Sequence, residues 1–210
     1  MRFNIFNKKL IGGLAAFLAI LMLFNQYMII SAASSISGDE IYLTGDSAID
    51  AKTLIFSKGT PKIYGEELGV VYEFDLRSQK IMNYMIIKMS DFDRGPHKID
   101  VESLPEDLRK RYIKLGTNIS CEFCCSAKSI TFPNGEPACG CAHSSAMRGL
   151  ALYLLKNHPN EFSDEEIMRE MARWKALFFP KQMMKKYIKQ AQKGSYTPDI
   201  AALLGGVANK

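Results

Sequence analysis

Hydrophobic positions are distributed unevenly along this chain, with one uninterrupted apolar run near the N-terminus. No charged side chain occurs within residues 10–30, and a helix of about 20 apolar residues crosses the hydrocarbon core of a bilayer. The basic residues of 1–9 precede this run, whereas acidic residues follow it before the next basic one. Because Lys and Arg favour the cytoplasmic side, the pattern predicts a cytoplasmic segment at 1–9 and a single-pass transmembrane anchor at 10–30. The bulk of the chain is then extracytoplasmic, at the cell membrane.

A cleaved signal peptide is the alternative interpretation of the same segment. Its basic start fits, and Ser31-Ala32-Ala33 supplies small residues of the kind found at cleavage sites. The apolar run is longer than the core of a usual signal peptide, which favours the uncleaved anchor. Both interpretations place most of the protein outside the cytoplasm.

The polar remainder predicts a linker followed by one domain. Residues 31–60 are rich in Ser, Gly, Asp and Thr and are typical of a stalk. Residues 60–65 and 70–74 have strand-like composition, whereas apolar residues recur at helical spacing over 77–90. We therefore expect an extracytoplasmic domain at 61–210 with an α+β, predominantly α, fold.

Most of this domain has the signals of helices. Ser103 with Glu106, and Ser163 with Glu166, have the spacing of capping boxes. The expected helices cover 103–115, 144–157, 163–179, 180–194 and 197–204. Asn134-Gly135 tolerates the positive φ angles of a tight turn and predicts a short, irregular hairpin between 129–132 and 136–141.

The charge balance argues against nucleic-acid binding. The chain has 27 Lys and Arg against 22 Asp and Glu, and three of the basic residues belong to the segment that precedes the predicted anchor. A late cluster of lysines has helical spacing, which is typical of a solvated helix face (Lys185, Lys186, Lys189 and Lys193). No basic stripe interleaved with aromatic residues remains, so we expect no nucleic-acid partner. The expected partner is the membrane, through the anchor, and a protein partner stays unidentified.

All five cysteines lie between Cys121 and Cys141. The first group has CxxC spacing, which lets two thiols turn toward one ion, and the second has CxC spacing, in which alternate side chains of an extended segment share a face. The intervening hairpin would bring the two groups together. This pattern predicts one metal site in which two cysteine pairs bind one ion, as in zinc ribbons and zinc knuckles.

The predicted ligands are Cys121, Cys124, Cys139 and Cys141. Cys125 and His143 form a second tier, as a further ligand, a redox partner or an outer-shell group. Zinc is the first choice of metal, and an iron–sulfur centre or copper remains open because four thiolates suit all three.

Two alternatives use the same cysteines without a metal. An extracytoplasmic location favours disulfides, and a CxxC or adjacent Cys124/Cys125 pair would suit thiol–disulfide exchange. The chain has no nucleophile elbow, phosphate-binding glycine loop or HExxH sequence. We therefore favour a metal-binding or interaction domain over an enzyme.

The segment from Cys121-Glu-Phe-Cys-Cys to Cys139-Gly-Cys-Ala-His-Ser, with the helix after it, resembles a motif in membrane-anchored archaeal and bacterial proteins of no assigned activity. The similarity covers roughly residues 105–205. A fainter likeness, limited to Cys139-Gly140-Cys141, connects it to bacterial lipoproteins with a Pro-Cys-Tyr-Cys-Gly-Cys motif. The resemblance implies a membrane-tethered, metal-binding domain and supplies no activity.

Overall fold

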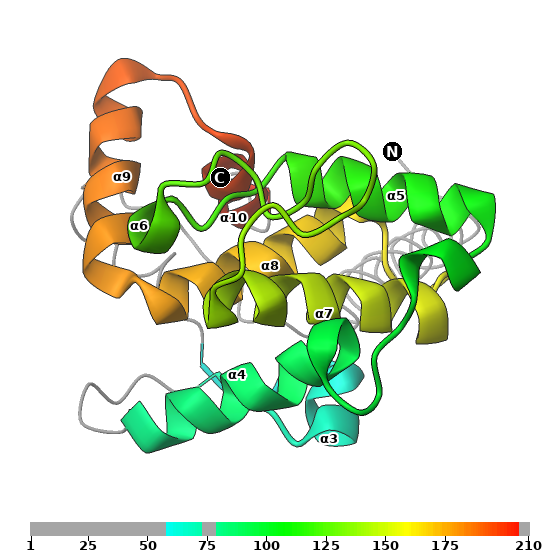
Figure 1. Ribbon diagram of the computed structural model, residues 1–210. Coiled ribbons are helices and arrows are strands. Elements are labelled where there is room, and N and C mark those ends of the chain that lie inside the picture. The colour runs from blue at the N-terminus through cyan, green and yellow to red at the C-terminus, as the bar shows by residue number, and fades with distance from the viewer. Residues whose placement is uncertain (1–57, 73–78, 206–210) are drawn as a thin grey trace, which may run out of the picture. The chain divides into compact units, whose positions relative to one another are not determined.

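Helices dominate the computed structural model, which describes residues 58–72 and 79–205 (Figure 1). They are α3 (Tyr64–Leu68), α4 (Gln79–Arg94), a short 3-10 helix (Val101–Ser103), α5 (Glu106–Thr117), α6 (Glu122–Cys125), α7 (Ala142–Asn157), α8 (Asp164–Phe178), α9 (Pro180–Lys193) and α10 (Pro198–Leu204). The predicted anchor at 10–30 and the stalk up to residue 57 lie outside the described residues. Within the described ranges, no helix is both long and apolar enough to span a bilayer.

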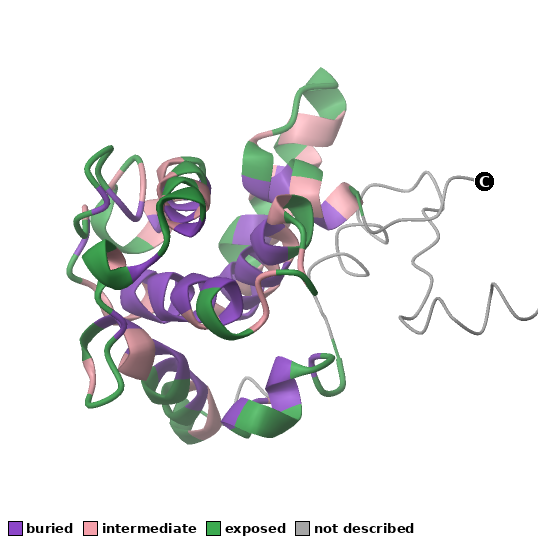
Figure 2. Ribbon diagram, turned by 90° about the vertical axis from the view of Figure 1, so that its right-hand side faces the viewer, coloured by how far each residue is buried: buried purple, intermediate pink, exposed green. Residues whose placement is uncertain are grey.

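Helix α7 is the centre of the domain. It contacts α4, α5 and α8, and 11 of its 16 residues are buried; Figure 2 shows that buried residues gather in the central helices. A largely apolar helix is expected at such a position, and the buried polar residues of α7 have hydrogen-bond partners (Ser144, Ser145 and Arg148). Small residues let its neighbours approach closely: a Cβ placed on Gly149 would lie 1.9 Å from the carbonyl oxygen of Met89 in α4.

Several local sequence signals are confirmed. Ser163 and Glu166 form the expected capping box at the start of α8. Pro180 and Pro198 stand in the first turns of α9 and α10, where a missing N–H costs no hydrogen bond. Helix α4 covers the described part of the predicted 77–90 segment, from Gln79, and continues to Arg94, with its methionines directed into the core.

The predicted start of α5 is wrong. Ser103 belongs to the preceding 3-10 turn, where its hydroxyl donates to the carbonyl oxygen of Asp100 at 2.6 Å. It is therefore not the cap of α5, which begins at Glu106 with Pro105 before it and no side-chain cap. Pro105 directs Leu104 into extended backbone, as a residue before proline prefers.

The expected strands reduce to isolated bridges in the described part of the chain. Gly59 pairs with Tyr72 and Thr131 with Pro137, and no ladder continues either pair. Segment 60–65, predicted as a strand, instead leads into helix α3, because Tyr64 is fixed by tertiary contacts: its hydroxyl donates to Glu170 Oε2 at 2.5 Å and accepts from Trp174 Nε1 at 2.9 Å. Tertiary packing overrides the local β preference here.

The turn at Asn134-Gly135 forms as expected. Gly135 has a φ of 87°, and the amide of Phe132 donates to the carbonyl oxygen of Glu136 at 2.7 Å. The prolines at 133 and 137 keep the paired segment short. This turn brings Cys139 and Cys141 back toward the helical turn that carries Cys121 and Cys124.

Candidate metal centre

Cys121 and Cys124 are positioned by one short helical turn. Cys121 precedes α6, and its carbonyl oxygen accepts from the amide of Cys124 at 3.2 Å. This turn places both thiols on the same side of the segment, as CxxC spacing predicts. Cys121 is fully buried, whereas Cys124 is exposed.

Cys141 and His143 come from the start of α7. Cys141 is the N-cap residue, and its sulfur accepts from the amide of Ser144 at 3.3 Å and lies 3.4 Å from the Ser144 hydroxyl oxygen. Helix N-termini favour negative charge, because their first amides have no partner within the helix. His143 follows in the first helical turn.

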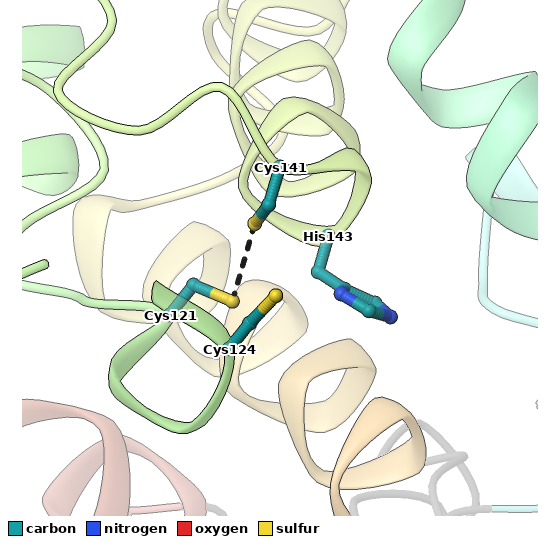
Figure 3. Close-up of side chains that lie close together, drawn as sticks. All are labelled: Cys121, Cys124, Cys141 and His143. Carbon is teal, nitrogen blue, oxygen red and sulfur yellow. Dashed lines mark hydrogen bonds between the residues drawn. The ribbon is translucent and has the colours of Figure 1, made fainter. Parts of the chain in front are cut away.

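These four side chains converge (Figure 3). Their ligand atoms all lie within 4.8 Å of one another, and the sulfurs of Cys121 and Cys141 are 3.5 Å apart. Two sulfurs bound to one tetrahedral zinc ion at about 2.3 Å are separated by roughly 3.8 Å. Small side-chain movements would therefore bring these donors to the separations of ligands around one tetrahedral ion.

The surroundings of His143 give the strongest support for a metal ion at this position. Its Nδ1 is buried and has no hydrogen-bond partner among the described residues, and an orphaned buried nitrogen is costly. The ring packs against Phe178 and Phe179, with centroids 5.1 and 4.7 Å away. Burial lowers the pKa of His143, which keeps the imidazole neutral at pH 7, the form that binds metal ions.

The thiols have unequal acidity. Burial, together with the adjacent Cys141 sulfur, raises the pKa of Cys121 to about 12, and burial and the charge of Cys141 also raise the pKa of Cys124. Burial acts in the same direction on Cys141, but hydrogen bonds from the Ser144 hydroxyl and amide outweigh it and lower its pKa. The surroundings of Cys141 therefore favour its thiolate form, whereas those of Cys121 and Cys124 favour the thiol.

Cys139 and Cys125 are paired with each other in a disulfide across the turn. Of the four predicted ligands, the structure thus groups Cys121, Cys124 and Cys141, and it adds His143 from the second tier. Cys139 is joined instead to the other second-tier residue, Cys125. One pair of cysteines therefore forms a disulfide, which was the alternative to metal binding, while three thiols stay free.

A buried ionic cluster fixes α6 to the helices behind it. Lys175 is fully buried, and its ammonium group contacts Glu122 Oε1 at 2.9 Å and Asp199 Oδ2 at 2.6 Å. Lys186 contacts the same two carboxylates at 2.5 and 2.9 Å. Because Glu122 adjoins Cys121, this cluster of Lys175, Lys186, Glu122 and Asp199 holds the first pair of thiols in place.

Arg148 holds the second half of the cysteine segment. Its guanidinium is buried and forms two contacts with the carboxylate of Asp93, at 2.8 and 2.7 Å. Its Nη1 donates to the carbonyl oxygens of Ile130 and Cys139 at 3.0 and 2.9 Å. The turn is thereby fastened to α7 and α4 independently of the disulfide.

Sequence patterns did not identify these supporting residues. Lys186 belongs to the lysine cluster expected on a solvated face, yet it enters the ionic cluster. Lys175 follows Trp174 and stands four residues after Met171, on the apolar side of α8. A lysine at such a position indicates a buried charge that needs a partner, so the sequence did contain a signal for it. Cys141 as a helix cap had a weaker signal, in the small polar residues Ser144 and Ser145 that follow it.

No known protein family, curated protein or solved structure matches this chain.

Proposed function

We propose that this protein binds one thiophilic metal ion, with zinc as the first choice, through Cys121, Cys124, Cys141 and His143. The observation that carries the proposal is the convergence of three free thiols on a buried imidazole nitrogen that has no other partner in the described structure. Three cysteines and one histidine are an established ligand set for zinc. Binding would give His143 Nδ1 a partner and join α6 to the start of α7.

The same site supports a role in metal handling as well as a structural role. Cys124 is exposed and Cys141 partly exposed, so one side of the proposed coordination shell faces solvent. Four protein ligands leave no open position on the ion, as in structural zinc sites, but an exposed ligand can be displaced by an incoming donor, which gives a route for exchange. We propose that the bound ion exchanges with metal carriers or chelators outside the protein.

We further propose that residues 10–30 anchor this metal-binding domain to the cell membrane, with the domain on the extracytoplasmic side. The support is the uncharged apolar run and its basic flank. Accessibility of Cys124 to a membrane-impermeant thiol reagent in intact cells tests the orientation. Labelling only after the membrane is permeabilised would contradict it.

Metal content measured on the full chain tests the central proposal. The chain is purified anaerobically in mild detergent, equilibrated with zinc, freed of excess metal and analysed by elemental mass spectrometry. We expect about one zinc per chain, and weaker zinc affinity in His143→Ala. His97→Ala is the matched control, because the His97 side chain is 74% exposed and lies outside the site.

Cobalt(II) substitution checks the ligand set. A tetrahedral site with thiolates gives intense d–d bands and a sulfur-to-metal charge-transfer band, and the latter should weaken in Cys124→Ser. An absence of metal in wild-type protein that retains three free thiols would refute the proposal. A visible absorption spectrum of an iron–sulfur cluster in the purified protein would replace zinc with iron.

A further inference from the structure

The disulfide lies directly beside the proposed metal site. The sulfurs of Cys125, Cys139 and Cys141 all lie within 4.8 Å of one another. Cys141 therefore belongs to two groups of donors, one with Cys121, Cys124 and His143, and one with the two disulfide sulfurs. This shared sulfur is the feature from which the inference starts.

We propose that reduction of the Cys125–Cys139 disulfide creates a second metal position, formed by Cys125, Cys139 and Cys141, with the Cys141 sulfur bridging the two ions. The inference rests on the proposed function, since the first ion occupies the site already described. A thiolate has lone pairs enough to bind two ions, and sulfur donors select zinc or copper(I). A copper(I) ion is satisfied by three thiolates, whereas zinc would take a solvent molecule as its fourth ligand.

The backbone around the second position is held without help from the disulfide. The carbonyl oxygen of Cys139 accepts from Arg148, and the amide of Ala138 donates to the carbonyl oxygen of Ile130 at 3.1 Å. On the other side, the amide of Cys125 donates to the carbonyl oxygen of Cys121 at 3.4 Å. The three sulfurs should therefore stay close to one another after the bond between two of them is broken.

Cys141 is well placed to bridge. It is the N-cap of α7, and its sulfur accepts from the amide of Ser144. That contact fixes the sulfur between the two groups and compensates part of the negative charge that several thiolates bring together. No other residue of the described chain belongs to both groups.

The chemical step is an ordinary reduction. A dithiol reductant transfers two electrons and two protons to the Cys125–Cys139 bond, which yields two thiols, and the dithiol itself becomes a disulfide. Cys125 is exposed, so an attacking thiolate can reach the bond. A metal ion then displaces the thiol protons as it binds.

Metal stoichiometry in the two redox states tests the inference. The full chain in detergent is prepared with the disulfide intact, and also after dithiothreitol treatment and anaerobic desalting. Thiol counts on denatured samples should give three and five thiols, respectively. Each form is equilibrated with zinc, freed of excess metal and analysed. We expect about one zinc in the oxidised chain and about two in the reduced chain.

A double variant, Cys125→Ser with Cys139→Ser, serves as the matched control and should bind one zinc whatever the redox treatment. If this variant does not fold, the comparison of oxidised and reduced wild-type protein decides by itself. One zinc in both wild-type states would overturn the second position and leave the proposed function standing. No zinc in the oxidised state would overturn the proposed function.

Bridging of the two ions by the Cys141 sulfur can be measured separately, by magnetic coupling between bound cobalt ions. Two cobalt(II) ions joined by one thiolate couple antiferromagnetically, so their electron paramagnetic resonance intensity should fall when the second equivalent binds to reduced protein. Two independent positions would instead double the signal, which would refute bridging by Cys141.

Discussion

The sulfurs of Cys121 and Cys141 lie 3.5 Å apart, although 20 positions separate the two residues along the chain. Each precedes a helix, α6 or α7, so the contact joins two helix starts. A metal ion bound there acts as a cross-link that only the folded state can form.

Zinc should stabilise the domain. A ligand present at about 100 times its dissociation constant adds about 2.7 kcal/mol to the free energy of unfolding, which corresponds to a rise in melting temperature of roughly 5–10 °C for a domain of this size. Differential scanning calorimetry with zinc and with chelator measures the shift. Cys141→Ser should lose it, and an equal shift in that variant would place the metal elsewhere.

The buried ion pair between Arg148 and Asp93 should dominate the stability of the cysteine segment. Arg148→Met leaves the buried carboxylate of Asp93 without its cationic partner, although the Ser145 hydroxyl still donates to it, and removes one donor from each of the carbonyl oxygens of Ile130 and Cys139. Removing one partner of a buried pair costs about 3–5 kcal/mol, and urea denaturation measures it. The exposed pair of Arg109 with Glu102 is the control, since Arg109→Met should cost less than about 1 kcal/mol. Equal losses would contradict the structural role of Arg148.

The close approach of α4 and α7 predicts a strong effect at Gly149. In Gly149→Ala the new methyl group meets the carbonyl oxygen of Met89, a backbone atom that moves only with its helix. We expect a loss of about 1–3 kcal/mol in the free energy of unfolding. At Gly140 an added Cβ meets nothing within 4 Å, so Gly140→Ala should lie within about 0.5 kcal/mol of wild type. A tolerated Gly149→Ala would mean that the helices are further apart than described.

His158 should make stability depend on pH near neutrality. Its Nε2 lies 2.8 Å from Glu67 and its Nδ1 lies 2.9 Å from Glu161. Burial acts to lower the pKa of His158, but the hydrogen bonds that its ring donates to the two carboxylates outweigh burial and raise the pKa. A raised histidine pKa stabilises the fold below the ordinary value of about 6.5, and this contribution is lost as the pH rises through the folded-state pKa.

Urea denaturation over roughly pH 5.5 to 8.5, a range that includes the ordinary histidine pKa, measures this dependence with chelator present. The hydrogen bonds of Tyr153 and His158 lower the pKa of Glu67, so its carboxylate stays ionised throughout. The free energy of unfolding should fall by less than about 1 kcal/mol as the pH rises, and this fall should disappear in His158→Gln. His97→Gln should retain it; an unchanged profile in His158→Gln would assign the pH dependence to another group.

Helical segments and their ends were largely predictable from sequence. The apolar spacing of α4, the capping box of α8 and the first-turn prolines of α9 and α10 are local signals, and they act through hydrogen bonds and sterics within a few residues. The strand expected at 60–65 was wrong because Tyr64 is fixed by Glu170 and Trp174, which lie more than a hundred positions away.

The candidate site was predictable as a segment and only partly as a ligand set. Spacing alone pointed to a site between Cys121 and Cys141, and to His143 as an associated residue. It did not show which thiols face one another, since that depends on how the turn at Gly135 and the contacts of Arg148 bring Cys139 back toward Cys125. Ion pairs such as Lys175 with Asp199 join separate helices and have no local pattern.

The sequence by itself determined that this protein has a helical domain, an apolar N-terminal segment and one concentrated group of cysteines, because composition and periodicity are properties of neighbouring residues. Only the tertiary structure decided that Cys125 pairs with Cys139 while Cys121, Cys124 and Cys141 stay free beside His143. The physical reason is that sulfur positions are set by long-range packing around α7, where a buried arginine and a buried lysine fix the two segments that carry the thiols.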